Sequence, residues 1–248
     1  MYRWQAGYLN ELLLMLYRKK MIVFIVVSAI LPVLLAVSLN ALQPYLGLLA
    51  VSSSFPIALL SIYTGLWIPL YILTVTADLF PAEVAARTLK LSLLRPNSRF
   101  QVFSAKLAAI GTGIALILLV LGIMTFICNL FSGTMLSAAE GFHFVEAYVA
   151  AFIAMIAIAA LFACMAQFFK SASGFIVAGI IFYAAAKIVP FIFSSFSAFS
   201  PTAYTDWHML WLSPTVSAGK LLTSGSFLVS SCMLFFTLGY YRFDKKEV

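Results

Sequence analysis

The charged residues between positions 83 and 106 are the part of this sequence best suited to chemistry. Glu83 opens this segment, which also holds five of the fifteen Lys and Arg residues of the chain: Arg87, Lys90, Arg95, Arg99 and Lys106. A cation at the centre of a membrane span costs about 2.5–3.5 kcal/mol on insertion scales. We therefore predict that the segment is a loop at a membrane surface, where its cations and leucines can bind a protein partner.

The residue patterns of known catalytic sites are absent from the sequence. The two histidines, His143 and His208, are isolated, and no two acidic residues lie deep within apolar runs. Gly219-Lys220 is followed by leucine, so it does not form a phosphate-binding loop. The three cysteines lie inside apolar runs without a C-x-x-C pair, which favours neither a disulfide framework nor a zinc site. We expect a non-catalytic chain with no metal or cofactor of its own; if ATP is used, another chain binds it.

Composition places the chain in the class of integral membrane proteins. It has 248 residues, of which 64% are hydrophobic and 9% are charged, whereas a soluble domain carries about 25% charged residues. The net charge of +7 does not favour nucleic-acid binding, because the cations flank apolar runs as topology signals do. Such cations also attract anionic membrane lipid.

Six apolar runs are long enough to cross a bilayer as helices. They span residues of about 21–39, 56–78, 107–129, 147–167, 174–196 and 222–241. The runs are continuous and do not alternate with period two, so barrel strands do not fit. We predict an all-α integral membrane protein with one transmembrane domain, residues 1–248, and six transmembrane helices.

Residues 1–20 form a separate element before the first span. Leucines recur there at helical spacing, with polar residues elsewhere on the helical wheel: Leu9, Leu12, Leu13 and Leu16. This pattern predicts an amphipathic helix in the membrane interface. The alternative is a disordered basic tail.

The loops differ strongly in Lys and Arg content. One side has four in the N-terminal tail, five in the second loop, one in the fourth loop and three in the C-terminal tail, thirteen in all, whereas the other side has only Lys220. Cytoplasmic loops carry the excess of Lys and Arg. We expect a multi-pass protein of the plasma (cytoplasmic) membrane with both termini in the cytoplasm.

Lys187 is the remaining cation and lies within the fifth apolar run, about 20 Å along the helix. An intramembrane ionisable residue is a candidate for translocation, and snorkelling towards water is the alternative. Glu146, at the start of the fourth run, is the hypothesised partner. Asp78, at the opposite depth, is expected to form ion pairs at the cytoplasmic surface.

Two further segments are expected to have structural roles. The fourth run is rich in alanine, which predicts close packing inside the chain, with a dimer interface as the alternative. The aromatic loop of residues 197–221 is expected to form an interfacial belt or a short helix pair, and a substrate gate is the alternative.

The second loop resembles the cytoplasmic loop of bacterial type-2 ATP-binding-cassette (ABC) transporter permeases. The shared pattern is an acidic residue, Thr-Leu, a leucine-rich turn, Pro-x-Ser-Arg and a lysine at the next span, here Glu83, Thr88, Leu89, Pro96, Ser98, Arg99 and Lys106. The sequence departs from the family at Arg87 and Ala105, where glycine is usual. The motif covers about a tenth of the chain, and the six-span architecture covers all of it.

This resemblance implies a cytoplasmic coupling helix that docks on an ATPase subunit. Its apolar face would be formed by Leu89, Leu93 and Leu94, with Arg87, Lys90 and Arg95 at the rim, and Pro96 would end it. The alternative is a solvated basic loop that only fixes topology.

The resemblance also implies the partners: two ABC ATPase subunits that bind ATP and Mg, and a second permease copy or a sister permease. We expect export of a hydrophobic or amphipathic substrate, such as an antimicrobial peptide, an antibiotic or a lipid-like molecule. The alternatives are ABC-type sodium efflux, a secondary transporter not driven by ATP, and a membrane-embedded enzyme.

Overall fold

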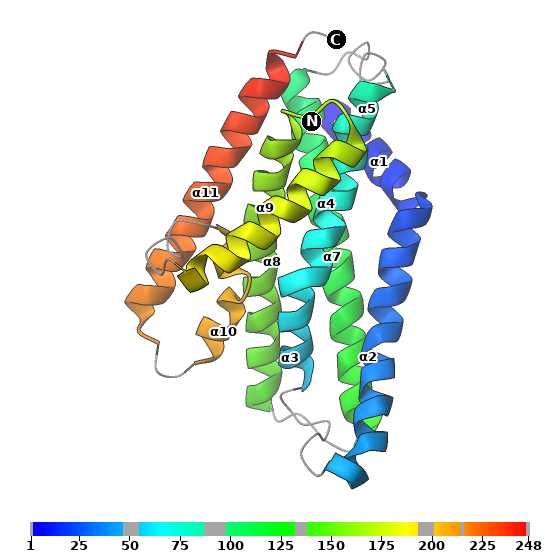
Figure 1. The fold of residues 1–248 in the computed structure, drawn as a ribbon, viewed down its shortest axis with the longest axis vertical. Coiled ribbons are helices and arrows are strands. Elements are labelled where there is room, and N and C mark those ends of the chain that lie inside the picture. Colours follow the sequence, from blue (N-terminus) through cyan, green and yellow to red (C-terminus); the bar gives the residue numbers. More distant parts are fainter. Residues whose placement is uncertain are drawn as a thin grey trace.

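The computed structural model describes residues 2–46, 55–86, 98–131, 138–192, 201–213 and 216–246, and every regular element in these ranges is helical (Figure 1). The elements are α1 (Tyr2–Leu16), α2 (Lys19–Leu46), α3 (Phe55–Ile62), the π-helical turn η1 (Tyr63–Trp67), α4 (Ile68–Leu79), α5 (Pro81–Ala85), α7 (Arg99–Phe131), α8 (Ala138–Ala166), α9 (Ala172–Ile192), the 3₁₀ turn η3 (Pro201–Tyr204), α10 (Trp207–Leu212) and α11 (Ala218–Asp244).

Six helical segments are long and apolar enough to cross a membrane, which confirms the six spans predicted from the sequence. They are Lys19–Ser38, Phe55–Ala85, Arg99–Phe131, Gly141–Ala166, Ala172–Val189 and Ala218–Asp244. The chain is therefore an all-helical, multi-pass membrane protein. Several boundaries differ from the prediction: the second span ends at Ala85 rather than near residue 78, the fourth begins at Gly141 rather than near residue 147, and α7 begins at Arg99 rather than near residue 107. Lys106 thus belongs to a spanning helix and not to the preceding loop.

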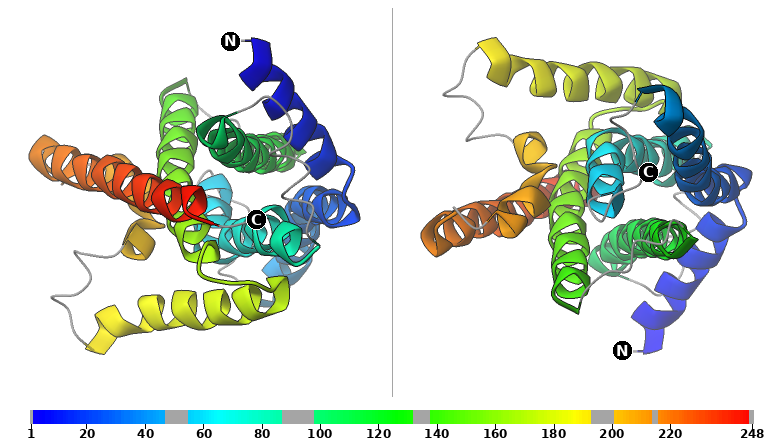
Figure 2. Two further views of the ribbon diagram at one scale, coloured as in Figure 1. Left: turned by 90° about the horizontal axis from the view of Figure 1, so that it is seen from above. Right: turned by 90° about the horizontal axis from the view of Figure 1, so that it is seen from below.

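Helix α8 lies at the centre of the bundle, with α4, α7 and α11 packed around it (Figure 2). Its small residues are buried inside the chain: Ala147, Ala150, Ala151, Ala154, Ala157, Ala160, Ala163 and Cys164. Small side chains let helix backbones approach closely. The prediction of internal packing for this segment is therefore confirmed.

Helices α1 and α2 pack on the outer side of α7. In α1 the apolar side chains of Leu9 and Leu13 are exposed, whereas Glu11 and Met15 are buried. In α2, Ser28 is buried and accepts a hydrogen bond from Trp67 Nε1 at 2.9 Å. Leu12 and Leu16 are half-buried against the core, so the leucines of α1 lie on both its outer and its inner side, with Glu11 facing the protein.

The second span is interrupted at η1, between α3 and α4. Pro69 has no N–H to donate to the carbonyl of Gly65, four residues earlier. The hydroxyl of Tyr183 on α9 donates to that carbonyl at 2.6 Å. The Tyr183 hydroxyl of the fifth span thus takes the place of the backbone N–H that Pro69 of the second span lacks.

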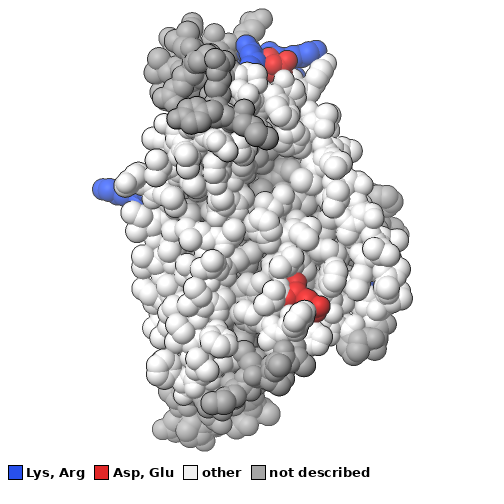
Figure 3. All heavy atoms as spheres, turned by 180° about the vertical axis from the view of Figure 1, so that it is seen from behind, with Lys and Arg blue, Asp and Glu red and all other residues white. Residues whose placement is uncertain are grey.

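Charged side chains gather at one end of the molecule (Figure 3), the end at which α5 and the last turns of α11 lie in Figure 1. In the view of Figure 3, cations cluster at this end and most of the surface below is uncharged, apart from an acidic patch low on the same face and a cation at one edge. This distribution fits a membrane span with one strongly charged surface.

Candidate functional site

Lys106 lies at the centre of a buried ion-pair group at the charged end. Its side chain is 0% exposed, and its Nζ lies 3.1 Å from a carboxylate oxygen of Glu11 and 2.7 Å from one of Glu83. An isolated ammonium in a protein interior is strongly unfavourable, so a buried lysine needs paired carboxylates. Two acidic side chains meet that requirement here.

This group joins three elements that are far apart in the sequence. Glu11 belongs to α1, Glu83 to α5 and Lys106 to α7. Residues 86–98, which connect α5 to α7, contain most of the basic segment singled out in the sequence. The two ends of that connection are therefore fixed to each other and to the N-terminal helix.

A second group of ion pairs lies close to the first. Asp78, near the end of α4, is 8% exposed and is bound by two cations from the α1–α2 junction. Arg18 Nη1 lies 3.1 Å from its Oδ2, and Lys20 Nζ lies 2.9 Å from its Oδ1. The predicted ion pairing of Asp78 is confirmed, although its partners come from the N-terminal tail rather than from the second loop.

The two groups together balance in charge, with three cations and three carboxylates: Lys106, Arg18, Lys20, Glu11, Glu83 and Asp78. Lys106 is fully buried within this group, whereas Arg18 and Lys20 remain partly exposed and bind Asp78 from the surface. The group links α1, α2, α4, α5 and α7 at one end of the bundle.

Arg99, at the start of α7, binds the C-terminal end of α11. Its Nη1 donates to the carbonyl of Asp244 and, at 3.1 Å, to that of Lys246. Cations at a helix C-terminus satisfy its free carbonyls and interact favourably with the helix dipole. The ammonium of Lys246 donates to Gln167 Oε1 at 3.2 Å, and burial lowers the pKa of Lys246 to about 8.

Most of the predicted coupling helix lies outside the described residues. This holds for Arg87, Thr88, Leu89, Lys90, Leu93, Leu94, Arg95 and Pro96. Glu83 and Arg99, at the two ends of this segment, are described, and both are held by contacts with other helices. The structure therefore positions the segment's ends.

Lys187 and Glu146 are not brought together, so the hypothesised ion pair between them is wrong. Lys187 Nζ donates to the hydroxyl of Thr205, in the segment between α9 and α10. Glu146 instead lies 3.3 Å from His143 Nδ1, one turn earlier on α8. The inclination of α9 carries Lys187 towards η3 and α10 rather than towards the start of α8 (Figure 1).

The aromatic segment after α9 forms two short helical turns, η3 and α10, that pack against α8. His208 is fully buried there, and its Nε2 lies 3.0 Å from Ser61 Oγ of α3. Burial lowers the pKa of His208, and the nearby carboxylate of Asp206 partly opposes this shift. This segment belongs to the aromatic loop of residues 197–221 predicted from the sequence, and it is joined to α3 of the second span through His208 and Ser61.

Sequence reasoning missed the contact between Glu11 and Lys106. Glu11 is an acidic residue within an otherwise leucine-rich helix, and Lys106 is a cation that precedes an apolar run by one residue. Both were interpreted as surface charges. The sequence did contain a signal for this contact. Lys106 stands at the edge of an apolar run, and Glu11 is an opposite charge within the N-terminal helix.

The ion pairs of the two groups connect helices that are far apart in the sequence. Within the residues described, no three His, Cys, Asp or Glu side chains come together as a metal site would require.

Residues 45–248 match a family described as "Protein of unknown function (DUF2705)". The chain belongs to this family. A comparison with curated proteins gives no match. The family match begins near the end of α2 and includes Glu83, Lys106 and Asp78, whereas Glu11, Arg18 and Lys20 precede it. The acidic and basic partners contributed by α1 and the start of α2 thus lie outside the matched region.

Proposed function

We propose that this chain is the membrane-spanning permease subunit of an ATP-driven ABC exporter. The observation that carries the proposal is the ion-pair group around Lys106, which fixes both ends of the basic 86–98 connection to α1 and α7. A permease driven by a separate ATPase needs a surface that the ATPase can move and a rigid link from that surface to the spans. The buried ion pairs supply such a link.

In this proposal the connection docks on an ATPase subunit inside the cell. Leu89, Leu93 and Leu94 enter a groove of the ATPase, and Arg87, Lys90 and Arg95 surround them. The charged end then faces the cytoplasm of a cell whose plasma membrane contains the chain. The excess of Lys and Arg in the loops and tails at that end supports this orientation.

The complex would contain two ATPase subunits, which bind ATP and Mg, and two permease halves, either two copies of this chain or one copy and a sister permease. The spans are rich in aromatic residues and poor in charge. This composition favours a hydrophobic or amphipathic cargo, such as an antimicrobial peptide, an antibiotic or a lipid-like molecule, over a polar one.

Co-purification with a candidate ABC ATPase, co-expressed with this chain, tests the proposal. We expect the wild-type permease to retain the ATPase in detergent. Leu93→Asp, and the double reversal of Arg87 and Arg95 to Glu, should abolish retention because they place charge in the apolar contact or invert its rim. Lys170→Glu is the matched control, because it reverses an exposed cation in the loop between α8 and α9.

All variants should enter the membrane fraction in normal amounts. Retention of the ATPase by both coupling variants at the level of Lys170→Glu would contradict the docking role. Absence of any ATPase from the wild-type preparation, with the permease intact, would contradict the proposed function itself.

A further inference from the structure

Helices α4 and α9 cross closely at one point and separate beyond it. A Cβ built on Gly179 would overlap a terminal methyl of Leu73, so the glycine leaves room for this side chain between the two helices. From this crossing α9 runs obliquely away from the bundle (Figures 1 and 2). The separation leaves a space between α9 and the interrupted part of the second span.

This space is an apolar pocket of about 490 Å³, within the usual range for small-molecule sites of about 300–1,000 Å³. Its inner wall includes the buried side chains of Leu73 and Phe162, and its outer rim includes the exposed side chains of Leu66, Ile180 and Ile188. Because both buried and exposed residues line it, the pocket opens sideways through the surface that faces lipid.

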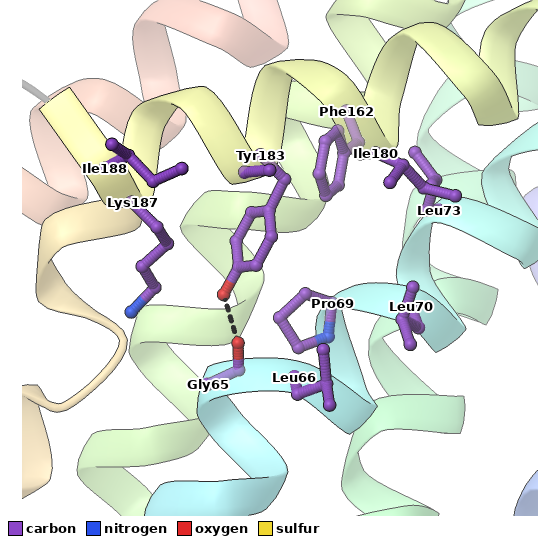
Figure 4. A pocket seen from close by; sticks show the side chains of 11 residues that line it. Gly65, Leu66, Pro69, Leu70, Leu73, Phe162, Ile180, Tyr183, Lys187 and Ile188 are labelled. Carbon is purple, nitrogen blue, oxygen red and sulfur yellow. Dashed lines mark hydrogen bonds between the residues drawn. The ribbon is translucent and has the colours of Figure 1, made fainter.

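Two polar side chains of α9 stand over the pocket (Figure 4). The hydroxyl of Tyr183 donates a hydrogen bond to the carbonyl of Gly65, which receives none from Pro69. This bond holds α9 to η1 at the wall of the pocket. Lys187, one turn further along, is the charged residue of the lining. In Figure 4 the Tyr183 side chain extends from α9 to Gly65 of η1, whereas the Lys187 side chain extends along one side of the pocket towards the segment that holds Thr205.

The charge of Lys187 is not neutralised by an ion pair within the part of the chain that the structure describes. Its hydrogen-bond partner is the neutral hydroxyl of Thr205, and the exposed carboxylate of Asp206 acts on it only at longer range. A cation next to an apolar cavity at membrane depth is unfavourable unless an anion is close. A charge-assisted hydrogen bond from an anionic group would remove this imbalance.

We propose that this pocket binds an amphiphile with an acidic head group and an alkyl chain. Lys187 binds the carboxylate or phosphate of the head, and the chain lies along Leu66, Leu70, Leu73 and Phe162. The molecule enters sideways from the bilayer through the opening between α9 and η1. This binding does not depend on the proposed export function, because it needs no ATPase and no second permease chain.

Photolabelling of the purified full-length chain in detergent tests this proposal. The probes are a diazirine-bearing fatty acid and the diazirine-bearing alcohol with the same chain, with the labelled peptides identified by mass spectrometry. We expect the acid to label α4 and α9 more strongly than the alcohol does. Lys187→Met should lower labelling by the acid about tenfold, the loss expected for one charge-assisted hydrogen bond.

Two further variants make the result specific. Ala184→Phe places a large side chain at an exposed position of the lining and should reduce labelling by both probes. Lys220→Met removes an exposed cation of α11 outside the pocket and should leave labelling unchanged. If Lys187→Met does not fold, the acid-to-alcohol ratio in the wild type and the effect of Ala184→Phe still decide the question.

Competition identifies the source of the ligand. Displacement of the acid probe by unlabelled phosphatidylglycerol assigns the pocket to a membrane phospholipid, whereas displacement by free fatty acid alone assigns it to a single-chain amphiphile; both outcomes support an acidic head. Equal labelling by acid and alcohol, or full labelling of a folded Lys187→Met variant, would overturn the proposal.

Discussion

Lys106 Nζ lies 2.7 Å from the carboxylate of Glu83, although the two residues stand at opposite ends of the basic segment. The chain leaves the second span at Glu83, passes through residues 86–98 and returns to the bundle beside its own starting point. A third charge, Glu11, places the N-terminal helix on the same ammonium. The two helices that flank the segment, α5 and α7, are therefore joined to each other and to α1 through one lysine.

Removal of the central ammonium is expected to destabilise the protein strongly. Lys106→Met leaves Glu11 and Glu83 buried without their cation, and breaking a buried ion pair in this way costs about 3–5 kcal/mol. The unfolding free energy in detergent should fall by that amount relative to Lys170→Met, which removes an exposed cation. A Lys106→Met variant as stable as Lys170→Met would show that the three charges do not interact in the folded protein.

Replacing Glu11, Glu83 and Lys106 together tests whether the stability lost in Lys106→Met comes from uncompensated charge or from substitution at these positions as such. In the triple variant Glu11→Gln, Glu83→Gln, Lys106→Met no charge is left uncompensated, and replacement of a buried ion pair by neutral side chains is often nearly neutral in stability. We expect the triple variant to recover most of the stability lost in Lys106→Met. Failure to recover would mean that packing of the lysine chain, rather than its charge, is the stabilising element.

The contact between α8 and α11 depends on a glycine. A Cβ on Gly239 would lie 3.1 Å from the Cα of Cys164 and 3.1 Å from Phe103 Cζ. Because a backbone atom cannot move aside alone, Gly239→Leu must push α11 away from α8, at a cost of about 1–3 kcal/mol. Thermal unfolding in detergent measures the effect.

Gly219 provides the matched control for this substitution. It lies on the same helix, and a Cβ there would meet no atom within 4 Å. Gly219→Leu should leave the unfolding temperature unchanged or raise it slightly, because leucine forms helix more readily than glycine. Equal effects of the two substitutions would argue against close packing of α8 and α11 at Gly239.

The number of spans was predictable from the sequence because hydropathy alone decides whether a helix can cross a bilayer. The boundary of α7 was not, since a lysine next to an apolar run is normally assigned to water, and only the three-dimensional proximity of Glu11 and Glu83 makes Lys106 an interior residue. The pairing proposed for Lys187 failed for a similar reason. Depth along a straight helix was used to choose Glu146, whereas the tilt of α9 brings Lys187 to Thr205.

The buried histidine of α10 predicts a dependence of stability on pH. Burial lowers the pKa of His208 in the folded state, whereas an unfolded histidine titrates near pH 6.5. Just below that pH the unfolded state therefore binds more protons than the folded state. The contribution of the neutral His208 to the free energy of unfolding is complete above about pH 6.5 and is lost as the pH falls.

Tryptophan fluorescence can follow this effect, because Trp207 and Trp211 lie on α10 with ring centroids 5.5 Å apart. The unfolding temperature of the wild type should decrease between about pH 7 and pH 5, across the ordinary titration range of histidine. His208→Gln should have a smaller decrease, because it removes the titrating group and keeps a side chain able to bond Ser61. The exposed His143, replaced by Gln, should retain the wild-type pH dependence. The same slope in wild type and His208→Gln would mean that another group carries the effect.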